Sequence, residues 1–339
     1  MTDTGTPLAP RPTLIDRFGR QVTYLRLSVT DRCDFRCVYC MESNPRFAPR
    51  DAVLALEELH AIARTFVALG VRKVRLTGGE PLVRRNITWL MRRVSVLSGL
   101  DELVITTNGS QLAVKAAEIR EAGVRRINIS LDSLRPDRFR CITRNGNLQQ
   151  VLDGIDAAIA AGFERIKLNS VILSNRNQDE IVDLVRFAVD KGINISFIEE
   201  MPVGNVGDHD RAEAFYSSER IRADLEPYFS LVPTTETTGG PARYYRVTES
   251  ETRVGFISPH THNFCSDCNR VRVTTEGRLL LCLGQEHSLD LREVLRRYPG
   301  DDERLRKAIV QAMHIKPEGH RFEIGVPSVI GRQMNVTGG

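Results

Sequence analysis

The chain has 339 residues, of which 41% are hydrophobic and 27% are charged, a composition typical of a globular protein that buries a sizeable core. Its 47 Lys and Arg residues nearly balance its 43 Asp and Glu residues, so the overall charge gives no reason to expect a nucleic acid partner. No apolar run approaches the length of a membrane span and no signal-peptide core begins the chain. We therefore also expect no membrane partner and a cytoplasmic location.

The first residues, Met1 to Pro12, are rich in Thr and Pro and predict a disordered tail over residues 1–15. From Val22 to about Ile198, strand-like and helix-like segments alternate, which predicts six β/α units around a parallel sheet. The predicted strands are Leu25–Thr30, Val74–Thr77, Leu103–Thr107, Arg126–Ser130, Ile166–Val171 and Ile193–Ile198. Apolar residues at helical spacing predict the helices between them.

Polar and apolar side chains alternate along these strands. In the first strand, Leu25 and Leu27 share one face while Arg26 and Ser28 share the other. A full eight-stranded barrel would instead fill its interior with branched apolar residues. We therefore predict an α/β fold with an incomplete (β/α)6 barrel over residues 16–215, around a polar, ligand-filled cavity. A sheet surface that faces solvent is the alternative interpretation.

Three cysteines in C-x3-C-x2-C spacing follow the first predicted strand: Cys33, Cys37 and Cys40. Because four cysteines complete a 4Fe-4S cluster, three with no fourth nearby predict a cluster with one iron open to a non-protein ligand. A zinc site completed by a distant His or Cys, or three unrelated thiols, are the alternatives. The turn Thr77-Gly78-Gly79-Glu80-Pro81 also follows a strand, so we expect it at the same rim, where its glycines let a ligand approach the backbone.

After about Gly204 the alternation ends, which predicts a smaller C-terminal α+β region over residues 216–339. This region contains a second trio, Cys265, Cys268 and Cys282. The trio predicts a second open cluster, and a Cys3His zinc site with His260, His262 or His287 is the alternative. With Cys141 left over, the seven cysteines are more typical of metal sites than of a disulfide framework.

Arg270 and Arg272 lie at the start of a strand-like run directly after the second cysteine pair. Residues two apart on a strand point to the same side, so both guanidiniums should lie beside the predicted second cluster. Arginine pairs of this kind suit bidentate contacts with anions, above all phosphate. Two exposed surface arginines are the alternative.

The first cysteine loop, with Tyr39 before its last cysteine, resembles the signature of the radical S-adenosylmethionine (SAM) enzymes. Together with the TGGEP turn, the second trio, the R-x-R sequence and the Gly-Gly end, the chain from about Asp16 onward closely resembles the GTP 3′,8-cyclase family of molybdenum cofactor biosynthesis. The combination of these motifs in this order is much more specific than any one of them.

This resemblance implies two 4Fe-4S clusters and SAM as cofactors, and GTP as the substrate. The first cluster would reduce SAM and so generate a 5′-deoxyadenosyl radical that removes the ribose 3′ hydrogen of GTP. The resulting carbon radical would add to guanine C8 and give 3′,8-cyclo-7,8-dihydro-GTP, while the second cluster would hold the guanine through its open iron. An electron donor such as flavodoxin or ferredoxin, a downstream cyclic pyranopterin monophosphate synthase and a possible homodimer are the implied partners.

The resemblance also assigns residues. The implied SAM contacts are Tyr39, Gly79, Ser130 and Met201. The implied GTP contacts are Arg26, Arg75, Thr106, Lys167, Arg270 and Arg272, and the last two join the first three cysteines as catalytic residues. Two positions depart from the family pattern, namely Ser196, where many relatives carry Arg, and Val336-Thr337 before the final glycines.

Two other functions fit parts of the sequence. A radical SAM enzyme with an auxiliary cluster could act on a peptide or another small molecule, but it would not need Arg270 and Arg272 beside the second site. A metal-sensing protein that binds nucleic acid would gather its basic residues on one surface, whereas here they are spread along the chain.

Overall fold

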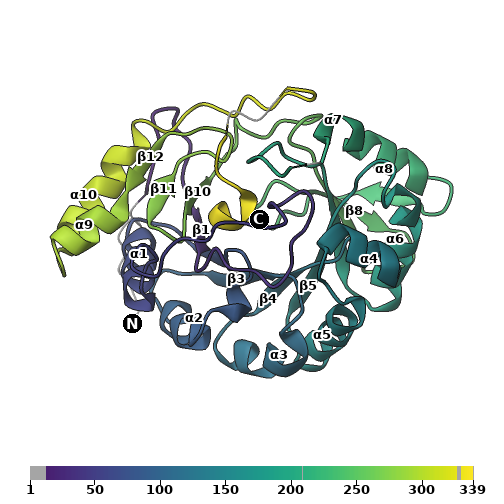
Figure 1. Ribbon diagram of the computed structural model, residues 1–339, viewed down its shortest axis with the longest axis horizontal. Helices are drawn as coiled ribbons and strands as arrows, with labels where there is room; N and C mark the ends of the chain where they lie inside the picture. Colours follow the sequence, from purple (N-terminus) through teal and green to yellow (C-terminus); the bar gives the residue numbers. More distant parts are fainter. Residues whose placement is uncertain (1–12, 208, 327–329, 339) are drawn as a thin grey trace, which may run out of the picture.

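The computed structural model describes residues 13–207, 209–326 and 330–338. In this part of the chain all strands belong to one curved sheet in the order β12-β11-β10-β1-β2-β3-β4-β5-β6-β9-β8-β7. Strands β1 to β6 are parallel throughout and pair in chain order. Figure 1 shows helices around the outside of this curved sheet and the C-terminal helix α11 in its middle. The prediction of an incomplete (β/α)6 barrel is therefore confirmed.

The bounds of the elements agree with the predicted strands to within a few residues. The barrel strands are β1 Tyr24–Ser28, β2 Lys73–Thr77, β3 Glu102–Thr107, β4 Arg126–Ser130, β5 Arg165–Val171 and β6 Asn194–Ile198. The helices of this part are α1 Leu56–Ala68, α2 Ile87–Ser95, α3 Leu112–Glu121, α4 Pro136–Thr143, α5 Leu148–Ala160 and α6 Ile181–Asp190, with 3-10 turns at Pro81–Val83 and Gln178–Glu180. Helix α4 is an addition that the sequence pattern did not predict.

The alternation along the strands sorts their side chains between two environments. Leu25 and Leu27 of β1 are fully buried and belong to the single large hydrophobic cluster that also contains the inner faces of the helices. Arg26, between them, instead lines a cavity inside the barrel. Because successive side chains of a strand point to opposite faces, the same alternation builds the core outside the sheet and a polar interior within it.

The C-terminal part of the chain adds to both edges of the barrel sheet. Its strand β10 pairs in parallel with β1, and its strand β9 pairs in parallel with β6. The remaining elements are α7 Arg211–Ala214, α8 Ser218–Leu225, β7 Leu231–Pro233, β8 Arg243–Val247, β9 Arg253–Ile257, β10 Arg270–Val273, β11 Arg278–Leu280, β12 Ser288–Asp290, α9 Leu291–Arg297, α10 Asp302–Met313 and α11 Met334–Thr337. The predicted C-terminal region thus shares its sheet with the barrel, and the boundary at residue 216 stays a prediction.

The predicted tail over residues 1–15 is too long at its end. Leu14 is buried in the core, its carbonyl oxygen accepts from Val22 N at 2.8 Å, and Ile15 forms an isolated bridge with Gln21. The apolar Leu14 side chain holds these residues against the barrel, while residues 1–12 lie outside the described part. Within the described residues, no helix combines the length and apolar character that a membrane crossing requires.

Candidate active site

The first cysteine loop lies between β1 and α1, and the segment at the end of α4 fixes its backbone. Arg36 N donates to the carbonyl oxygen of Thr143 at 2.9 Å, and Arg144 Nη1 donates to the carbonyls of Arg36 and Met41, each at 3.0 Å. The loop thiols are thereby left to face a cavity, here named the cysteine-loop cavity, that is lined by Cys33, Cys37 and Cys40. All seven cysteines are free of disulfides. Three free thiols on one cavity fit a 4Fe-4S cluster that leaves one iron open.

The TGGEP turn after β2 packs directly against this loop. A Cβ atom at Gly79 would lie 2.3 Å from the carbonyl oxygen of Arg32, so any side chain here would push the two segments apart. Glu80 is fully buried and accepts hydrogen bonds from Leu82 N at 2.9 Å, Thr107 Oγ1 at 2.8 Å and Asn108 N at 2.6 Å. Burial raises the pKa of Glu80 to about 8, although these hydrogen bonds oppose the shift. Glu80 therefore ties the ends of β2 and β3 together at the rim.

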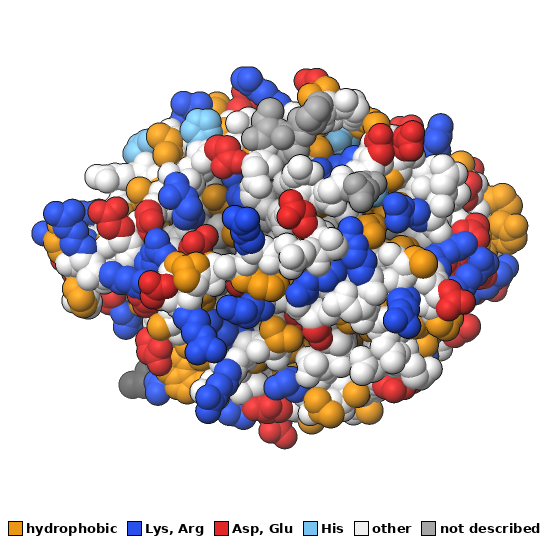
Figure 2. Space-filling view, viewed as in Figure 1, with side chains coloured by type: hydrophobic (Ala, Val, Ile, Leu, Met, Phe, Trp, Pro, Cys, Tyr) orange, Lys and Arg blue, Asp and Glu red, His pale blue; other side chains and the backbone are white. Residues whose placement is uncertain are grey.

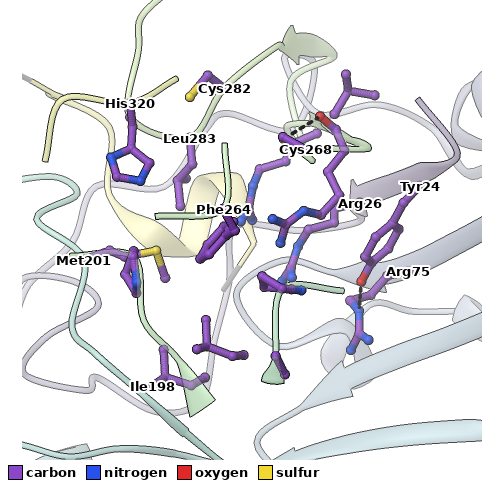
Figure 3. Close-up of a pocket in the computed structure, with 18 of the residues that line it drawn as sticks. Tyr24, Arg26, Arg75, Ile198, Met201, Phe264, Cys268, Cys282, Leu283 and His320 are labelled. Carbon is purple, nitrogen blue, oxygen red and sulfur yellow. Dashed lines mark hydrogen bonds between the residues drawn. The ribbon is translucent and has the colours of Figure 1, made fainter. Parts of the chain in front are cut away.

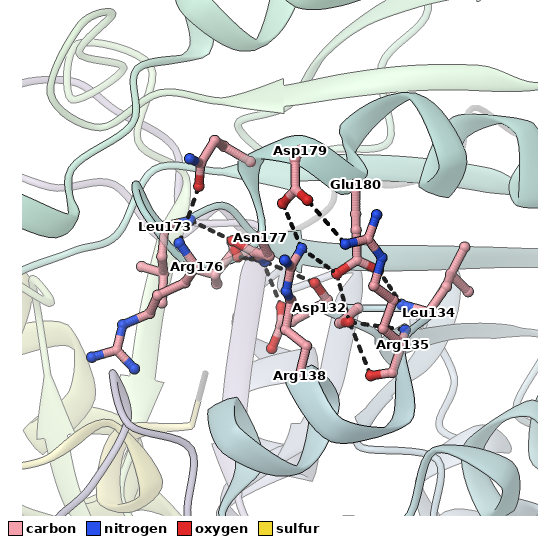
Figure 4. Close-up of polar contacts among 12 residues, drawn as sticks. Asp132, Leu134, Arg135, Arg138, Leu173, Arg176, Asn177, Asp179 and Glu180 are labelled. Carbon is pink, nitrogen blue, oxygen red and sulfur yellow. Dashed lines mark hydrogen bonds and ion pairs between the residues drawn. The ribbon is translucent and has the colours of Figure 1, made fainter.

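Tyr39 connects the cysteine loop to the turn after β4. Its hydroxyl donates to Asp132 Oδ2 at 2.6 Å, and Asp132 Oδ1 accepts from Val171 N at 2.8 Å. In the network of Figure 4, Asn177 Nδ2 donates to the carbonyl oxygen of Asp132 at 2.7 Å, which ties the turns after β4 and β5 together. Burial raises the pKa of Asp132 to about 6, while the hydrogen bonds from Tyr39 and Val171 lower it.

We expect Tyr39→Phe to lower the free energy of unfolding by about 1.5–3 kcal/mol at pH 7.5, because a buried carboxylate loses a hydrogen bond. Without the hydroxyl, the pKa of Asp132 should rise above 6. A raised pKa in the folded state favours the protonated form, so stability falls as pH rises through that value. The difference in the free energy of unfolding between Tyr39→Phe and the unaltered protein should therefore be smaller at pH 5 than at pH 7.5. Unfolding curves of both proteins at the two pH values test this, and an equal deficit at both would contradict it.

A second cavity, here named the arginine cavity, lies between the barrel interior and the second cysteine trio (Figure 3). The strand register places Arg272 of β10 beside Arg26 of β1, and Arg26 beside Arg75 of β2. Five positive side chains line this cavity: Arg26, Arg75, Lys167, Arg270 and Arg272. No Asp or Glu of the described residues lines it. The arginine cavity is therefore built to receive an anion.

Hydrogen bonds and charge orient the groups in this cavity. Arg75 Nη1 donates to Thr106 Oγ1 at 2.6 Å, and Arg75 Nε donates to the hydroxyl of Tyr24. Burial alone would raise the pKa of Tyr24, but the nearby Arg75, Arg26 and Lys73 lower it to about 7. Burial, with the repulsion of Arg26 and Arg270, holds the pKa of Arg272 well below its ordinary value. These shifts mark a concentration of positive charge with little solvent to screen it.

All three cysteines of the second trio line the arginine cavity. The buried Lys316 lies close to them, since its Nζ is 3.6 Å from Cys268 Sγ and donates to the carbonyl oxygen of Leu281 at 3.1 Å. His320 also lines the cavity, and its buried Nε2 has no hydrogen-bond partner among the described residues. None of His260, His262 and His287, the histidines of the alternative zinc site, lines this cavity. In the described part of the chain, no three His, Cys, Asp or Glu side chains are arranged to hold a single metal ion.

Arg20 holds the backbone around the second trio. Its guanidinium donates to the carbonyl oxygens of Cys265 at 2.7 Å, Glu318 at 2.5 Å and Pro317 at 2.6 Å, and its Nε pairs with Asp16 at 2.7 Å. One arginine thus joins the N-terminal segment, the cysteine pair and the segment before His320. No sequence motif indicated this role, because the contacts join positions about 245 and 298 residues apart.

We expect Arg20→Ala to release the loop around Cys265 and to lower the occupancy of the second cluster, with the first cluster retained. Charge-assisted hydrogen bonds to three carbonyls would be lost together. Iron analysis after anaerobic reconstitution should then give roughly half of the iron of the unaltered protein, since each of the two sites holds one four-iron cluster. Arg17→Ala, an exposed neighbour, is the matched control. Full iron content in Arg20→Ala would rule out this role.

The two cavities meet inside the barrel. Both are lined by Thr106, Asn169, Ile198, Met201 and Met334. The C-terminal segment reaches this junction, where Gly338 O accepts from Arg272 Nη1 at 2.5 Å and from Arg26 Nη2 at 3.3 Å. Helix α11 is anchored to the first loop, because Met334 N donates to the carbonyl oxygen of Cys40 at 3.2 Å. Gly338 therefore lies at the junction of the two cavities, while Gly339 lies outside the described residues.

The structure brings the predicted site residues together in these two cavities. The cysteine-loop cavity contains the first cysteine trio with Tyr39, Gly79, Ser130 and Met201. The arginine cavity contains the second trio with Arg26, Arg75, Thr106, Lys167, Arg270 and Arg272. Ser196 is fully buried in β6 and pairs with Gly255 of β9, where a Cβ atom would lie 2.5 Å from Ser196 Oγ and 2.8 Å from the Tyr244 ring. The space around Ser196 is therefore filled, and the longer side chain of Arg would require its neighbours to move.

Several residues that line or adjoin the two cavities were not predicted as site residues from the sequence. Asn128 and Asn169 line the cavities from β4 and β5, and the strand alternation already placed them on the inner face. Tyr24 begins β1 two residues before Arg26, so the same alternation places it on the inner face, and Asp132 lies in the turn after β4, where the carboxyl ends of the strands form the rim. Lys316 and His320 come from the segment after α10, so only the folded chain brings them to the site.

Comparison with known proteins agrees with this architecture. The family model described as the radical SAM superfamily matches residues 27–188, and the one described as Molybdenum Cofactor Synthesis C matches residues 193–322. A crystal structure of Streptococcus suis SuiB bound to S-adenosylmethionine is similar to this chain with a TM-score of 0.63 and 16% identity, covering 84% of this chain and 68% of that one. The fold and the first cysteine loop thus define a radical SAM protein.

Comparison with curated relatives identifies the family within the radical SAM proteins. The GTP 3′,8-cyclase of Pseudomonas entomophila (strain L48) is 61% identical over 327 residues, which cover 96% of this chain and 98% of the relative. That of Marinobacter nauticus is 60% identical over 330 residues, which cover 97% of this chain and 100% of the relative. The chain belongs to the GTP 3′,8-cyclase family.

Proposed function

We propose that the two cavities form one active site that binds SAM at the first cysteine loop and GTP in the arginine cavity, and converts GTP to 3′,8-cyclo-7,8-dihydro-GTP. This reaction is the first step of molybdopterin biosynthesis. The observation that supports GTP most directly is the charge of the arginine cavity. Five buried or half-buried cations face a space with no described carboxylate in its wall, and a triphosphate supplies the missing negative charge.

The position of each residue in the arginine cavity indicates which part of GTP it would contact. Arg26 and Arg75 on the neighbouring strands β1 and β2, together with Lys167 on β5, line the arginine cavity, where they neutralise and orient the triphosphate. Arg270 and Arg272 lie between them and the second trio, whose open iron would hold the guanine. His320 presents a neutral ring on the same wall, because burial lowers its pKa to about 4. The sugar of GTP is thereby held at the junction of the two cavities.

The cysteine-loop cavity would bind SAM, the second molecule that the reaction needs. Gly79 and Ser130 offer backbone and hydroxyl groups to SAM, and Tyr39 and Met201 offer apolar surface on its walls. The first cluster, when bound, supplies the electron for reductive cleavage of SAM. Because Met201 and Thr106 belong to both cavities, the reacting carbon of SAM and the ribose of GTP would meet without solvent between them.

This function needs partners outside the chain. A protein of the flavodoxin or ferredoxin kind would supply the electron, and a cyclic pyranopterin monophosphate synthase would consume the product. A homodimer and the absence of nucleic acid partners remain part of the same proposal.

An anaerobic assay tests the function. The protein is reconstituted with iron and sulfide, mixed with SAM and dithionite, and 5′-deoxyadenosine is quantified with GTP, with ATP and without nucleotide. We expect deoxyadenosine and a cyclised guanine nucleotide to form only with GTP. Equal slow formation of deoxyadenosine under all three conditions, with GTP unchanged, would keep the SAM chemistry and refute the substrate.

A further inference from the structure

An arginine-rich surface lies directly outside the first cysteine loop. We name it the loop face and define it by Arg32, Arg36, Arg46, Phe47 and Arg144. Arg32 and Arg46 are exposed, and Arg36 and Arg144 are half-buried. Figure 1 places the segment after β1 across the middle of the barrel opening, and Figure 2 shows Lys and Arg side chains over the middle of the same view.

The loop face is in direct contact with the backbone that carries the cysteines. Arg36 Nη1 donates to the carbonyl oxygens of Cys33 at 2.5 Å and Phe35 at 2.8 Å. The guanidiniums of Arg32 and Arg36 each lie 5.3 Å from the centre of the Phe47 ring, so the ring holds both charges in place. A molecule on this surface would therefore be separated from the first cluster site by little more than the cysteine loop.

The charge of the loop face is not neutralised by the protein itself. Among the described residues, none of its four arginines forms an ion pair, whereas Arg135, just before α4, and Arg138, within α4, both pair with Asp179. Two acidic residues lie between positions 32 and 50. Asp34 is turned inward and accepts from Asn108 Nδ2 at 2.7 Å and Ser110 Oγ at 2.6 Å, while Glu42 is exposed and is not ion-paired with these arginines in the described part of the chain. Unpaired positive charge around one aromatic ring is typical of a surface that attracts an acidic partner.

We propose that the loop face is the docking site of an acidic one-electron carrier protein, which reduces the cluster at the first cysteine loop. The step transfers a single electron from the carrier to the cluster, and no atom moves with it. This inference rests on the proposed function, because that function consumes one electron for each SAM cleaved. Electrostatic attraction would set the encounter rate and orient the carrier toward the loop.

The test compares two ways of reducing the same protein. Arg32→Glu/Arg46→Glu reverses two charges whose side chains donate no hydrogen bond that holds the loop. Arg85→Glu/Arg92→Glu changes the net charge equally at exposed positions on the outer side of the barrel. Each variant is reconstituted, and the rate at which its two clusters lose visible absorbance is measured with a reduced, acidic flavodoxin and, separately, with dithionite.

We expect flavodoxin to reduce the loop-face variant about tenfold more slowly than the unaltered protein at low ionic strength. This difference in rate should become smaller at high salt. Reduction by dithionite should stay within about twofold, and the control variant should match the unaltered protein with both reductants. Equal slowing with both reductants would overturn the proposal, because it would mean damage to the cluster. If flavodoxin reduces the loop-face variant at the normal rate but the variant no longer binds a short single-stranded RNA, the proposal is overturned, and the loop face is instead a site for nucleic acid.

These measurements separate this inference from the proposed function. Cluster reduction is read directly and does not depend on which nucleotide the enzyme uses. If dithionite with GTP yields no deoxyadenosine in the unaltered protein, the function fails whatever the reduction rates show. If that assay succeeds and the loop-face variant accepts electrons from flavodoxin normally, only the docking site fails.

Discussion

Arg272→Ala should lower GTP-dependent formation of deoxyadenosine about 100-fold, which corresponds to about 2.7 kcal/mol of lost transition-state stabilisation. Arg272 is aligned with Arg26 and Arg75 across neighbouring strands and lines the arginine cavity with the second cysteine trio. Loss of a largely buried cation that faces a bound anion is costly because little solvent enters the cavity to replace the lost interaction, even though other cations share the wall. The anaerobic assay with saturating SAM and varied GTP measures the effect.

In contrast to its activity, the stability of nucleotide-free Arg272→Ala should not fall. Arg26 and Arg270 repel Arg272 in the absence of substrate, and burial adds a desolvation penalty. The unfolding temperature of nucleotide-free Arg272→Ala should therefore equal or exceed that of the unaltered protein. Arg272→Lys is the matched control, since it keeps the charge but loses the planar fork and should retain an intermediate rate. A large loss of stability in Arg272→Ala would instead assign the residue a structural role.

Gly338→Ala should lower the same activity at least tenfold and leave the folded core intact. The added Cβ would lie 2.2 Å from Thr77 Cγ2, and Gly338 has a φ of +77°, a conformation that favours glycine. The C-terminal segment would have to withdraw, and Gly338 O would lose its contacts with Arg272 and Arg26. The Michaelis constant for GTP and the rate constant at saturation together report whether binding or positioning suffers.

A second substitution provides the control for this prediction. Thr77→Ser removes the methyl group that the new Cβ would meet, so Thr77→Ser/Gly338→Ala should recover part of the activity. Thr77→Ser alone should be close to normal. Normal activity of Gly338→Ala would show that the segment lies elsewhere during turnover.

The local pattern of the chain determined the barrel and most of the site. Alternation placed Arg26, Arg75 and Lys167 on the inner face, since a strand has a period of two and its direction fixes where every second side chain points. The cysteine spacing predicted two cluster sites, because the ligands of one cluster must lie close in space and the cysteines of each trio already lie close in sequence. Family resemblance then supplied roles that spacing by itself could not.

Tertiary structure alone decided how these parts are joined. The pairing of β10 with β1, which aligns Arg272 with Arg26, joins strands about 245 residues apart, and no local pattern encodes such a register. The same holds for Arg20 on the carbonyl of Cys265, for Tyr39 on Asp132 and for Gly338 between Arg26 and Arg272. A sequence specifies local direction and chemistry, whereas contacts between distant segments depend on the packing of the whole sheet. That packing brought the two cysteine motifs to two adjoining cavities.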